Sequence, residues 1–273
     1  RQAPFAQEQH HAGLLRPDSA DAPGFSEAKQ VAKEIEDLPD TAIARGQAAL
    51  IFDYDSAFAW EAQPQGADFD YFQLVFEAYK ALRRAGLSVD VLAPDMRPEG
   101  YEIVIAPGLM ILPDHLKKTS NGTTLCVGPR AGSKTEEMSI PVPLPPGIPG
   151  FSATVTHVET LPPYAPLPMS GGGAITKWQE ATETTDDVVI ETEGGQPILI
   201  RKGTLHYLAG WPDARGWHRV LESLAGRSLP SLPEGLRCRD TATHRFWFNY
   251  GPAPASHDHV NLPPAGVHWE VRQ

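Results

Sequence analysis

The chain is poor in cysteine, in basic charge and in long apolar runs, and each scarcity excludes a class of protein. Its two cysteines, Cys126 and Cys238, lie far apart and lack CxxC spacing, so neither a disulfide framework nor a zinc site is expected. With 23 Lys and Arg against 34 Asp and Glu, the formal net charge is −11, which disfavours nucleic acid and anionic membranes as partners. No run approaches the ~20 apolar residues of a membrane span, and no signal-peptide core is present at the start. We therefore expect a cytoplasmic protein, and nothing in the sequence calls for a cofactor.

What the sequence does contain is a change of pattern along its 273 residues, which suffice for one large or two ordinary domains. Residues 25–38 carry apolar side chains at helical spacing, which predicts an amphipathic helix that must pack on another part of the protein. From residue 47 onward, short apolar runs alternate with a helical pattern at residues 69–84, which indicates a parallel α/β sheet. The strands predicted for this part cover residues 48–52, 88–92, 102–106, 123–127, 187–191, 197–201 and 204–208, and a further helix covers residues 217–224.

Two later segments differ from this α/β pattern. Residues 139–172 are rich in proline and glycine, which predicts an excursion without regular elements that is held by tertiary or subunit contact. Pro230 and Pro233 then mark a linker. The alternating residues 243–248 and 267–271 predict a small antiparallel β unit at the end of the chain.

Five short segments, spread over nearly the whole chain, stand out as motifs. They read Arg1-Gln-Ala-Pro-Phe-Ala-Gln-Glu-Gln-His-His-Ala-Gly-Leu14, Trp60-Glu-Ala-Gln-Pro-Gln-Gly66, Gly128-Pro-Arg-Ala-Gly-Ser-Lys-Thr135, Leu232-Pro-Glu-Gly235 and Phe248-Asn-Tyr-Gly251. In this order they resemble successive landmarks of the family 42 β-galactosidases. The resemblance implies the end of a catalytic (β/α)₈ barrel at residues 1–45. It further implies an α/β trimerisation domain of amidotransferase-like (flavodoxin-like) parallel-sheet fold at residues 46–229, and a small antiparallel β domain at residues 230–273.

The function that this resemblance implies is a retaining β-galactosidase that hydrolyses terminal non-reducing β-D-galactosyl residues and assembles as a homotrimer. Such an enzyme needs two carboxyl groups about 5 to 5.5 Å apart. In the family both come from barrel strands that would precede residue 1. The opening segment also looks like the middle of a domain, so we expect a fragment of a longer enzyme that is inactive alone. A non-catalytic sugar-binding or assembly module is the second hypothesis.

Glu8 and His11 are the candidate substrate-binding residues. They stand at i and i+3, so on a helical turn they project from one face. A carboxylate beside an imidazole suits sugar hydroxyl groups, and both positions match residues that contact the galactosyl unit in the family. The alternative is a solvated pair at a helix start. Glu-x-x-His also occurs as a di-iron ligand pattern, but that use needs a second such pair, and none is evident in the sequence.

Asp53-Tyr-Asp55 leaves a phosphatase open as a third class. The pattern directly follows an apolar strand, as in aspartate-dependent phosphatases, although polar residues at a strand end are the simpler interpretation. The aromatic side chains nearby, which include Phe58, Trp60 and Phe72, could cover a sugar ring, fill a core or form an interface. The sequence leaves these three uses open.

Cys126 imitates the nucleophile of a class I amidotransferase, because it lies near a strand end and His157 and Glu159 could serve as its partners. The imitation is imperfect, since Thr124 stands where the nucleophile turn requires glycine. A buried structural cysteine is the favoured interpretation.

Overall fold

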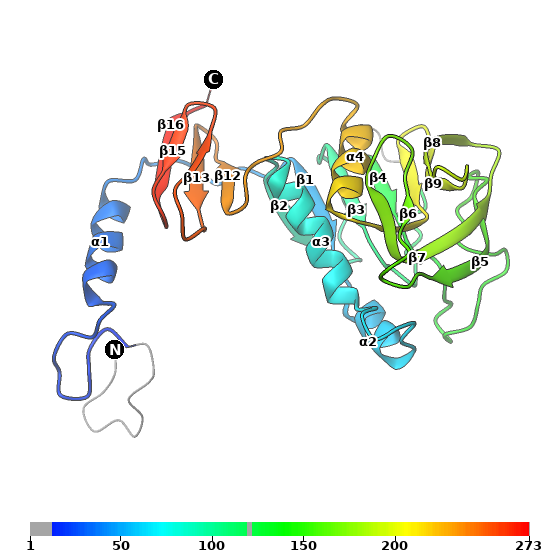
Figure 1. The fold of residues 1–273 in the computed structure, drawn as a ribbon, viewed down its shortest axis with the longest axis horizontal. Coiled ribbons are helices and arrows are strands. Elements are labelled where there is room, and N and C mark those ends of the chain that lie inside the picture. The colour runs from blue at the N-terminus through cyan, green and yellow to red at the C-terminus, as the bar shows by residue number, and fades with distance from the viewer. Residues whose placement is uncertain (1–12, 119–121, 273) are drawn as a thin grey trace. The chain divides into compact units, whose positions relative to one another are not determined.

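A computed structural model describes residues 13–118 and 122–272, and the chain divides into two compact units, Arg1–Ala42 and Ile43–Gln273 (Figure 1). In the first unit, α1 (Phe25–Glu36) forms where the helical spacing predicts it. No side chain of α1 is buried, and its apolar residues Val31 and Ile35 are exposed. The helix itself is therefore confirmed, and the surface on which it packs stays a prediction.

A seven-stranded sheet forms the centre of the second unit, in the order β2-β1-β3-β4-β10-β9-β8. Its strands are β1 (Ala48–Ile51), β2 (Val89–Leu92), β3 (Ile103–Ala106), β4 (Thr124–Val127), β8 (Asp187–Glu191), β9 (Pro197–Lys202) and β10 (Leu205–Leu208). Neighbours from β2 to β10 run parallel, whereas β9 and β8 are antiparallel additions. The strands β1 and β3 are buried throughout, which explains why each reads as an unbroken apolar run.

The two faces of this sheet are covered differently. Three helices, α2 (Tyr54–Ala62), α3 (Tyr71–Arg84) and α4 (Ala214–Ala225), share one core with the sheet, and α3 lies along β1 and β2 (Figure 1). The opposite face is covered by irregular segments that carry Leu109, Leu116, Ile148 and Phe151. Flavodoxin-like folds place helices on both faces of the sheet. The structure thus bears out the coarser prediction of a mixed α/β fold with a parallel sheet.

The proline-rich segment is more regular than the sequence predicts. Both β5 (Thr154–Thr160) and β6 (Leu167–Pro168) lie within residues 139–172 and pair antiparallel with β7 (Ala174–Glu183). A short strand, β11 (Gly210–Pro212), completes this second sheet. The expectation of no regular elements in this segment was wrong, because the closely spaced prolines stand at residues 141–149, ahead of β5.

The end of the chain forms the antiparallel β unit that the alternating pattern predicts. A three-stranded sheet consists of β12 (Leu236–Asp240), β13 (His244–Asn249) and β16 (Val267–Val271), and a hairpin consists of β14 (Ala255–His257) and β15 (Val260–Leu262). Leu236, Trp247 and Leu262 belong to a small core of its own. The domain boundaries near residues 45 and 229 stay a prediction.

Candidate functional site

Glu8 and His11, the candidate galactose contacts, lie in residues 1–12 and so outside the described part of the chain. Their role stays a prediction. Within residues 13–118 and 122–272, no group of three or more His, Cys, Asp or Glu side chains is arranged to hold a metal ion. Over the same ranges, no helix combines the length and the apolarity needed to cross a bilayer.

Asp53 caps the start of α2, which explains the Asp53-Tyr-Asp55 pattern. Its carboxylate accepts the N–H of Ser56 at 2.9 Å, the N–H of Asp55 at 3.3 Å and the hydroxyl of Ser56 at 2.6 Å. The Ser56 oxygen accepts the N–H of Met110 at 3.0 Å in turn. Such a cap satisfies backbone donors at a helix start and contributes about 1 kcal/mol. Both carboxylate oxygens of Asp53 therefore serve the fold, which supports the simpler interpretation of this pattern.

Cys126 is a fully buried residue of β4. Burial raises the pKa of its thiol to about 12, so the nucleophilic thiolate is scarce near neutral pH. His157 and Glu159, its partners in an amidotransferase-like triad, are exposed on β5, with 3.5 Å between the imidazole Nε2 and a carboxylate oxygen. An enclosed thiol and an exposed imidazole cannot form a catalytic pair. The prediction of a buried cysteine is confirmed.

His206 is the residue of β10 that lies opposite Cys126 in the parallel ladder. Burial lowers the pKa of this imidazole to about 4, so the ring is neutral near neutral pH. Neither ring nitrogen has a hydrogen-bond partner in the part of the chain that the structure describes. Because both side chains are enclosed, the pair is inaccessible to a substrate.

The aromatic group near residue 60 divides between core and surface. The rings of Trp60 and Phe69 stack at a centroid distance of 4.3 Å, and the Trp60 Nε1 donates to the carbonyl of Gly108 at 3.1 Å. Trp60 is only 1% exposed, so its indole faces neither substrate nor a neighbouring subunit. In contrast, Phe58 and Phe72 remain 62% and 54% exposed. Trp60 and Phe69 therefore belong to the core, which is one of the three uses that the sequence left open.

The structure also shows a buried cation that the sequence analysis missed. The guanidinium of Arg130, in the loop after β4, lies 5.0 Å from the ring centroid of Trp178, 5.4 Å from that of Trp60 and 5.8 Å from that of Phe69. The quadrupoles of these rings attract the cation. Burial lowers the pKa of Arg130. The nearby charge of Glu180 opposes this shift, so aromatic contacts and a carboxylate together favour the charged form of this buried arginine.

Glu180, on β7, is the buried carboxylate of the same region. It accepts the backbone N–H of Arg130 at 2.8 Å, the indole N–H of Trp178 at 3.2 Å and the hydroxyl of Tyr207 at 2.5 Å. Burial raises the pKa of Glu180, and these three donors oppose that rise. The contacts join β7 of the second sheet to the loop after β4 and to β10 of the first. We therefore interpret Glu180 as a structural residue that ties the two sheets together.

An exposed aromatic surface lies on α2 and α3, next to the buried rings. We define this aromatic face by Tyr54, Phe58 and Phe72, with Phe52 beneath it. Centroid distances of 4.9 Å from Phe52 to Tyr54, 5.2 Å from Phe52 to Phe72 and 6.4 Å from Tyr54 to Phe58 make the face continuous. A contiguous apolar surface of this kind is typical of a contact with another protein surface.

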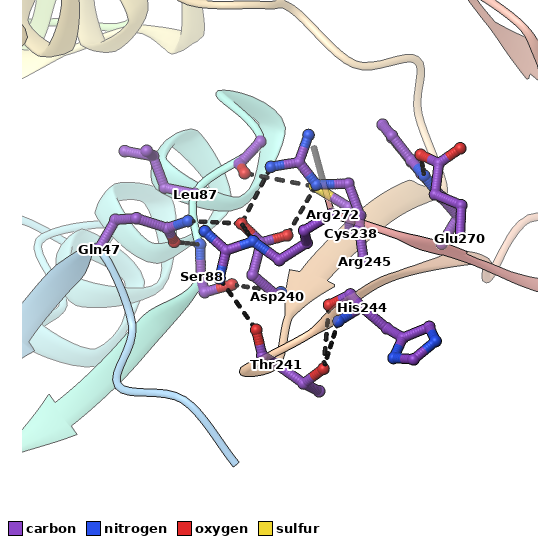
Figure 2. Close-up of polar contacts among 12 residues, drawn as sticks. Gln47, Leu87, Ser88, Cys238, Asp240, Thr241, His244, Arg245, Glu270 and Arg272 are labelled. Atoms are coloured by element: carbon purple, nitrogen blue, oxygen red, sulfur yellow. Dashed lines mark hydrogen bonds and ion pairs between the residues drawn. The ribbon is translucent and has the colours of Figure 1, made fainter. Parts of the chain in front are cut away.

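Asp240 holds the β unit against the α/β part of the same compact unit. Its carboxylate accepts two hydrogen bonds from Arg245, at 2.7 and 2.9 Å, and one from the amide of Gln47 at 2.8 Å (Figure 2). Its backbone N–H donates to the hydroxyl of Ser88 at 3.0 Å. Arg272 adds a second guanidinium, with its Nε 3.8 Å from the carboxylate. The contacts therefore link β12, β13 and the last residues to the starts of β1 and β2.

Burial by itself would raise the pKa of Asp240, and the hydrogen bonds and charge of Arg245 oppose that rise. The charge of Arg272 and the amide of Gln47 act in the same direction. Together they hold the pKa of this carboxyl below its ordinary value of 3.8. Asp240 is thus a charged structural junction, and a carboxylate with its oxygens so occupied is poorly placed for catalysis.

Comparison with known proteins identifies what this scaffold is. Residues 46–229, most of the chain, match the family model described as the β-galactosidase trimerisation domain. The chain belongs to the family 42 β-galactosidases. It is 44% identical over 276 residues to a β-galactosidase of Thermus thermophilus, covering 94% of this chain and 42% of the relative. It is 43% identical over 267 residues to BgaA of a Thermus species, covering 92% and 41%.

Solved structures of the family agree with this assignment. The β-galactosidase of the psychrophilic Marinomonas ef1 superposes with a TM-score of 0.89 at 33% identity, over 100% of this chain and 46% of that one. The enzyme of the Antarctic haloarchaeon Halorubrum lacusprofundi superposes with a TM-score of 0.86 at 25% identity, over 97% and 45%. This chain therefore spans less than half the length of the family 42 enzymes that it matches, and corresponds to their C-terminal portion.

Proposed function

We propose that this chain is part of a retaining β-galactosidase that hydrolyses terminal non-reducing β-D-galactosyl residues. The observation that carries the proposal is the trimerisation-domain match over residues 46–229, together with relatives that are β-galactosidases. On this proposal the chain supplies assembly and part of the galactose pocket, and both catalytic carboxylates lie in a barrel that precedes it. Residues 1–45 would end that barrel, and residues 46–229 would be a variant of the amidotransferase-like fold. A cytoplasmic location stays a prediction.

The burial and hydrogen bonding of Glu180 and Asp240 support the proposal that neither catalytic carboxylate lies in this chain. A glycosidase nucleophile must reach the anomeric carbon, and an acid/base must reach the glycosidic oxygen. Glu180 is fully enclosed and accepts three hydrogen bonds, and Asp240 is occupied by two residues of the fold. Neither is free to attack or protonate a sugar.

Replacement of Glu8 tests the proposed galactose contact. In the full-length enzyme, Glu8→Ala should lower kcat/KM by about 10- to 100-fold, since hydrogen bonds to charged groups are worth about 1.5–3 kcal/mol. The measurement is steady-state kinetics on a β-galactoside. The control is Glu27→Ala, which removes an exposed carboxylate in the first turn of α1. Unchanged kinetics in the Glu8 variant would show that the contact does not exist.

We further propose a homotrimer assembled through residues 46–229. In such a trimer each subunit uses two different surfaces, one for each neighbour, and these contacts close into a ring when the rotation between subunits is three-fold. Exposed apolar groups in this range are concentrated in two places, the aromatic face and the stretch that carries Ile140, Val142 and Leu144. A specific subunit contact commonly buries about 800 Å² per partner. Trp60 is enclosed in the core, so it is Phe58 and Phe72 that we assign to the contact.

Light scattering at micromolar concentration should give three times the 29.7 kDa mass of one chain. The double variant Phe58→Ser/Phe72→Ser should shift the mass towards that of a monomer, because it removes apolar surface from the centre of the contact. Val271→Ser, which alters an exposed apolar residue on β16 outside the trimerisation region, is the matched control. A monomer in the unaltered protein would refute the trimer. A trimer that persists in the double variant would refute only the surface assigned to it.

A further inference from the structure

A groove between α3 and the β unit has no role in the proposed galactosidase function. It is open to the surface and has a volume of about 860 Å³, within the range of small-molecule sites. Two of the sequence motifs, residues 232–235 and residues 248–251, meet along it. Its lining consists of Phe76, Tyr79, Lys80, Arg83, Pro233, Glu234, Gly235, Arg237, Tyr250, Gly251, Pro252, Ala253, Pro254, Ala255 and Ser256.

The wall formed by residues 250–254 is held in shape from behind. The buried amide of Asn249 donates to the carbonyl of Ala253 at 2.8 Å and to that of Pro263 at 2.9 Å, and its oxygen accepts the N–H of Gly251 at 2.9 Å. Across the groove base, Gly235 has a φ of +83°, and a Cβ there would lie 2.8 Å from the nitrogen of Gly251. The positive φ and the close approach explain the glycine at 235, and the contacts make the groove a preformed feature.

The charge of the groove is opposite to that of the chain. Lys80, Arg83 and Arg237 line it, whereas the chain as a whole carries a formal charge of −11. The one carboxylate in the lining, Glu234, has an exposed side chain and lies 3.9 Å from Arg84, which stands just outside the lining. Among the described residues, no carboxylate lies within ion-pair distance of the three lining cations. The groove thus holds three cations and one carboxylate, and Glu234 offsets their positive charge only in part.

Two of these cations are partly buried and held in place. Arg83 is only 8% exposed, and its Nη1 donates to the carbonyl of Leu87 at 2.7 Å. Arg237 donates to the carbonyls of Pro233 at 3.2 Å and of Leu236 at 2.6 Å. Burial lowers the pKa of Arg237; the charge of Glu234 opposes this shift, and the charges of Arg84 and Arg83 reinforce it. Pre-positioned guanidinium groups that repel each other favour an anion placed between them.

Aromatic rings stand beside this charge. Phe76, Tyr79, Lys80 and Arg83 occupy positions i, i+3, i+4 and i+7 of α3, so one helix face presents rings and cations together. On the opposite wall, Tyr250 is 72% exposed and stacks on Phe248 at 5.9 Å. Such rings can cover the apolar face of a small cyclic ligand.

We propose that this groove binds a sugar phosphate, with the phosphate held by Arg83, Arg237 and Lys80 and the sugar ring placed against Tyr250. Guanidinium groups recognise phosphate oxygens bidentately, and Lys80 adds a mobile point charge at the rim. The site lies on the C-terminal side of the chain and is independent of whether the galactosidase proposal holds.

Isothermal titration calorimetry on the 273-residue chain at low ionic strength tests the site. The probes are galactose 6-phosphate, galactose and inorganic phosphate. Galactose 6-phosphate should bind saturably, at least about tenfold more tightly than either of the other two, because only it offers both the charge and the ring. Added salt should weaken this binding, since partly exposed charges are screened.

Three variants locate the binding, and a melting curve confirms that each is folded. Arg237→Gln should weaken galactose 6-phosphate binding by at least about tenfold, and Lys80→Gln by about threefold. Tyr250→Ala should lower the affinity for galactose 6-phosphate towards that for inorganic phosphate. Arg97→Gln removes an exposed arginine outside the groove and should change nothing. The proposal is overturned by absence of saturable binding, by equal binding of galactose or of inorganic phosphate, or by Arg237 and Lys80 variants that both bind as the unaltered protein does.

Discussion

Purified alone, the 273-residue chain should show no hydrolysis of a chromogenic β-galactoside, whereas the full-length enzyme should turn it over. A retaining mechanism needs one carboxylate to form the glycosyl-enzyme and a second group to protonate the leaving oxygen and then activate water. Enzymes accelerate their reactions by about 10⁶-fold or more, so the loss should be complete in practice. The measurement is release of the chromophore under identical conditions at matched molar concentrations.

The control for this experiment must exclude a trace of intact enzyme. Activity that co-elutes with the 29.7 kDa chain through two different separations, and that scales with its amount, would contradict the prediction. Activity that separates from the chain would be contamination. Addition of the catalytic barrel proposed to precede this chain, as a second polypeptide, gives a positive outcome to look for, since restored turnover would locate the chemistry in that barrel.

Replacement of Asp240 by asparagine should lower the free energy of unfolding by about 2 kcal/mol. Removing one partner of a buried ion pair typically costs about 3–5 kcal/mol, but Arg245 and Arg272 are 39% and 41% exposed, so solvent screens part of the loss. The measurement is urea denaturation at neutral pH. Asp187→Asn, which breaks the exposed pair with Arg201, is the matched control and should change stability by less than about 0.5 kcal/mol. An equal effect in the two variants would contradict the structural role of Asp240.

The Asp240→Asn substitution should also change how the free energy of unfolding depends on pH in the acid range. Because the pKa of Asp240 is lower in the folded state than its ordinary value of 3.8, its contribution is present above that value. The contribution is lost as the pH falls through the folded-state pKa. The unaltered protein should therefore lose stability more steeply below about pH 4 than the Asp240→Asn variant does, when both are measured by denaturation at a series of pH values.

The sequence predicts best the strands whose burial can be read from their own residues. β1 and β3 are buried on both faces, so an apolar run is sufficient to mark them. β7 was missed because its ten residues mix Lys177, Gln179 and Glu180 with apolar side chains. Their burial depends on partners that are distant in sequence, such as Tyr207 for Glu180. Nothing local to β7 indicates that pairing.

The candidate sites show the same dependence on distant contacts. Asp53 looked like a possible nucleophile because a strand end followed by two carboxylates is also the start of a capped helix, and α2 was not predicted. Phe58 and Trp60 are two residues apart, yet one is exposed and the other fills the core. The contacts of the Trp60 indole with Gly108, Phe69 and Arg130 distinguish the two residues. The family resemblance, by contrast, could be read from short motifs and is confirmed.

The pairing of β4 with β10 sets a condition on how this fold can form. β4 ends at Val127, and its neighbour β10 begins only at Leu205, after β5, β6 and β7 of the second sheet and β8 and β9 of the first have intervened in the chain. Until residues 205–208 are in place, β4 presents an open edge whose backbone groups can pair with another chain. Closing such distant contacts is slow because the loop entropy must be overcome first. During synthesis, the edge of β4 is therefore open to pairing with another chain until β10 has been made, and the native sheet is complete only after β10 pairs with β4.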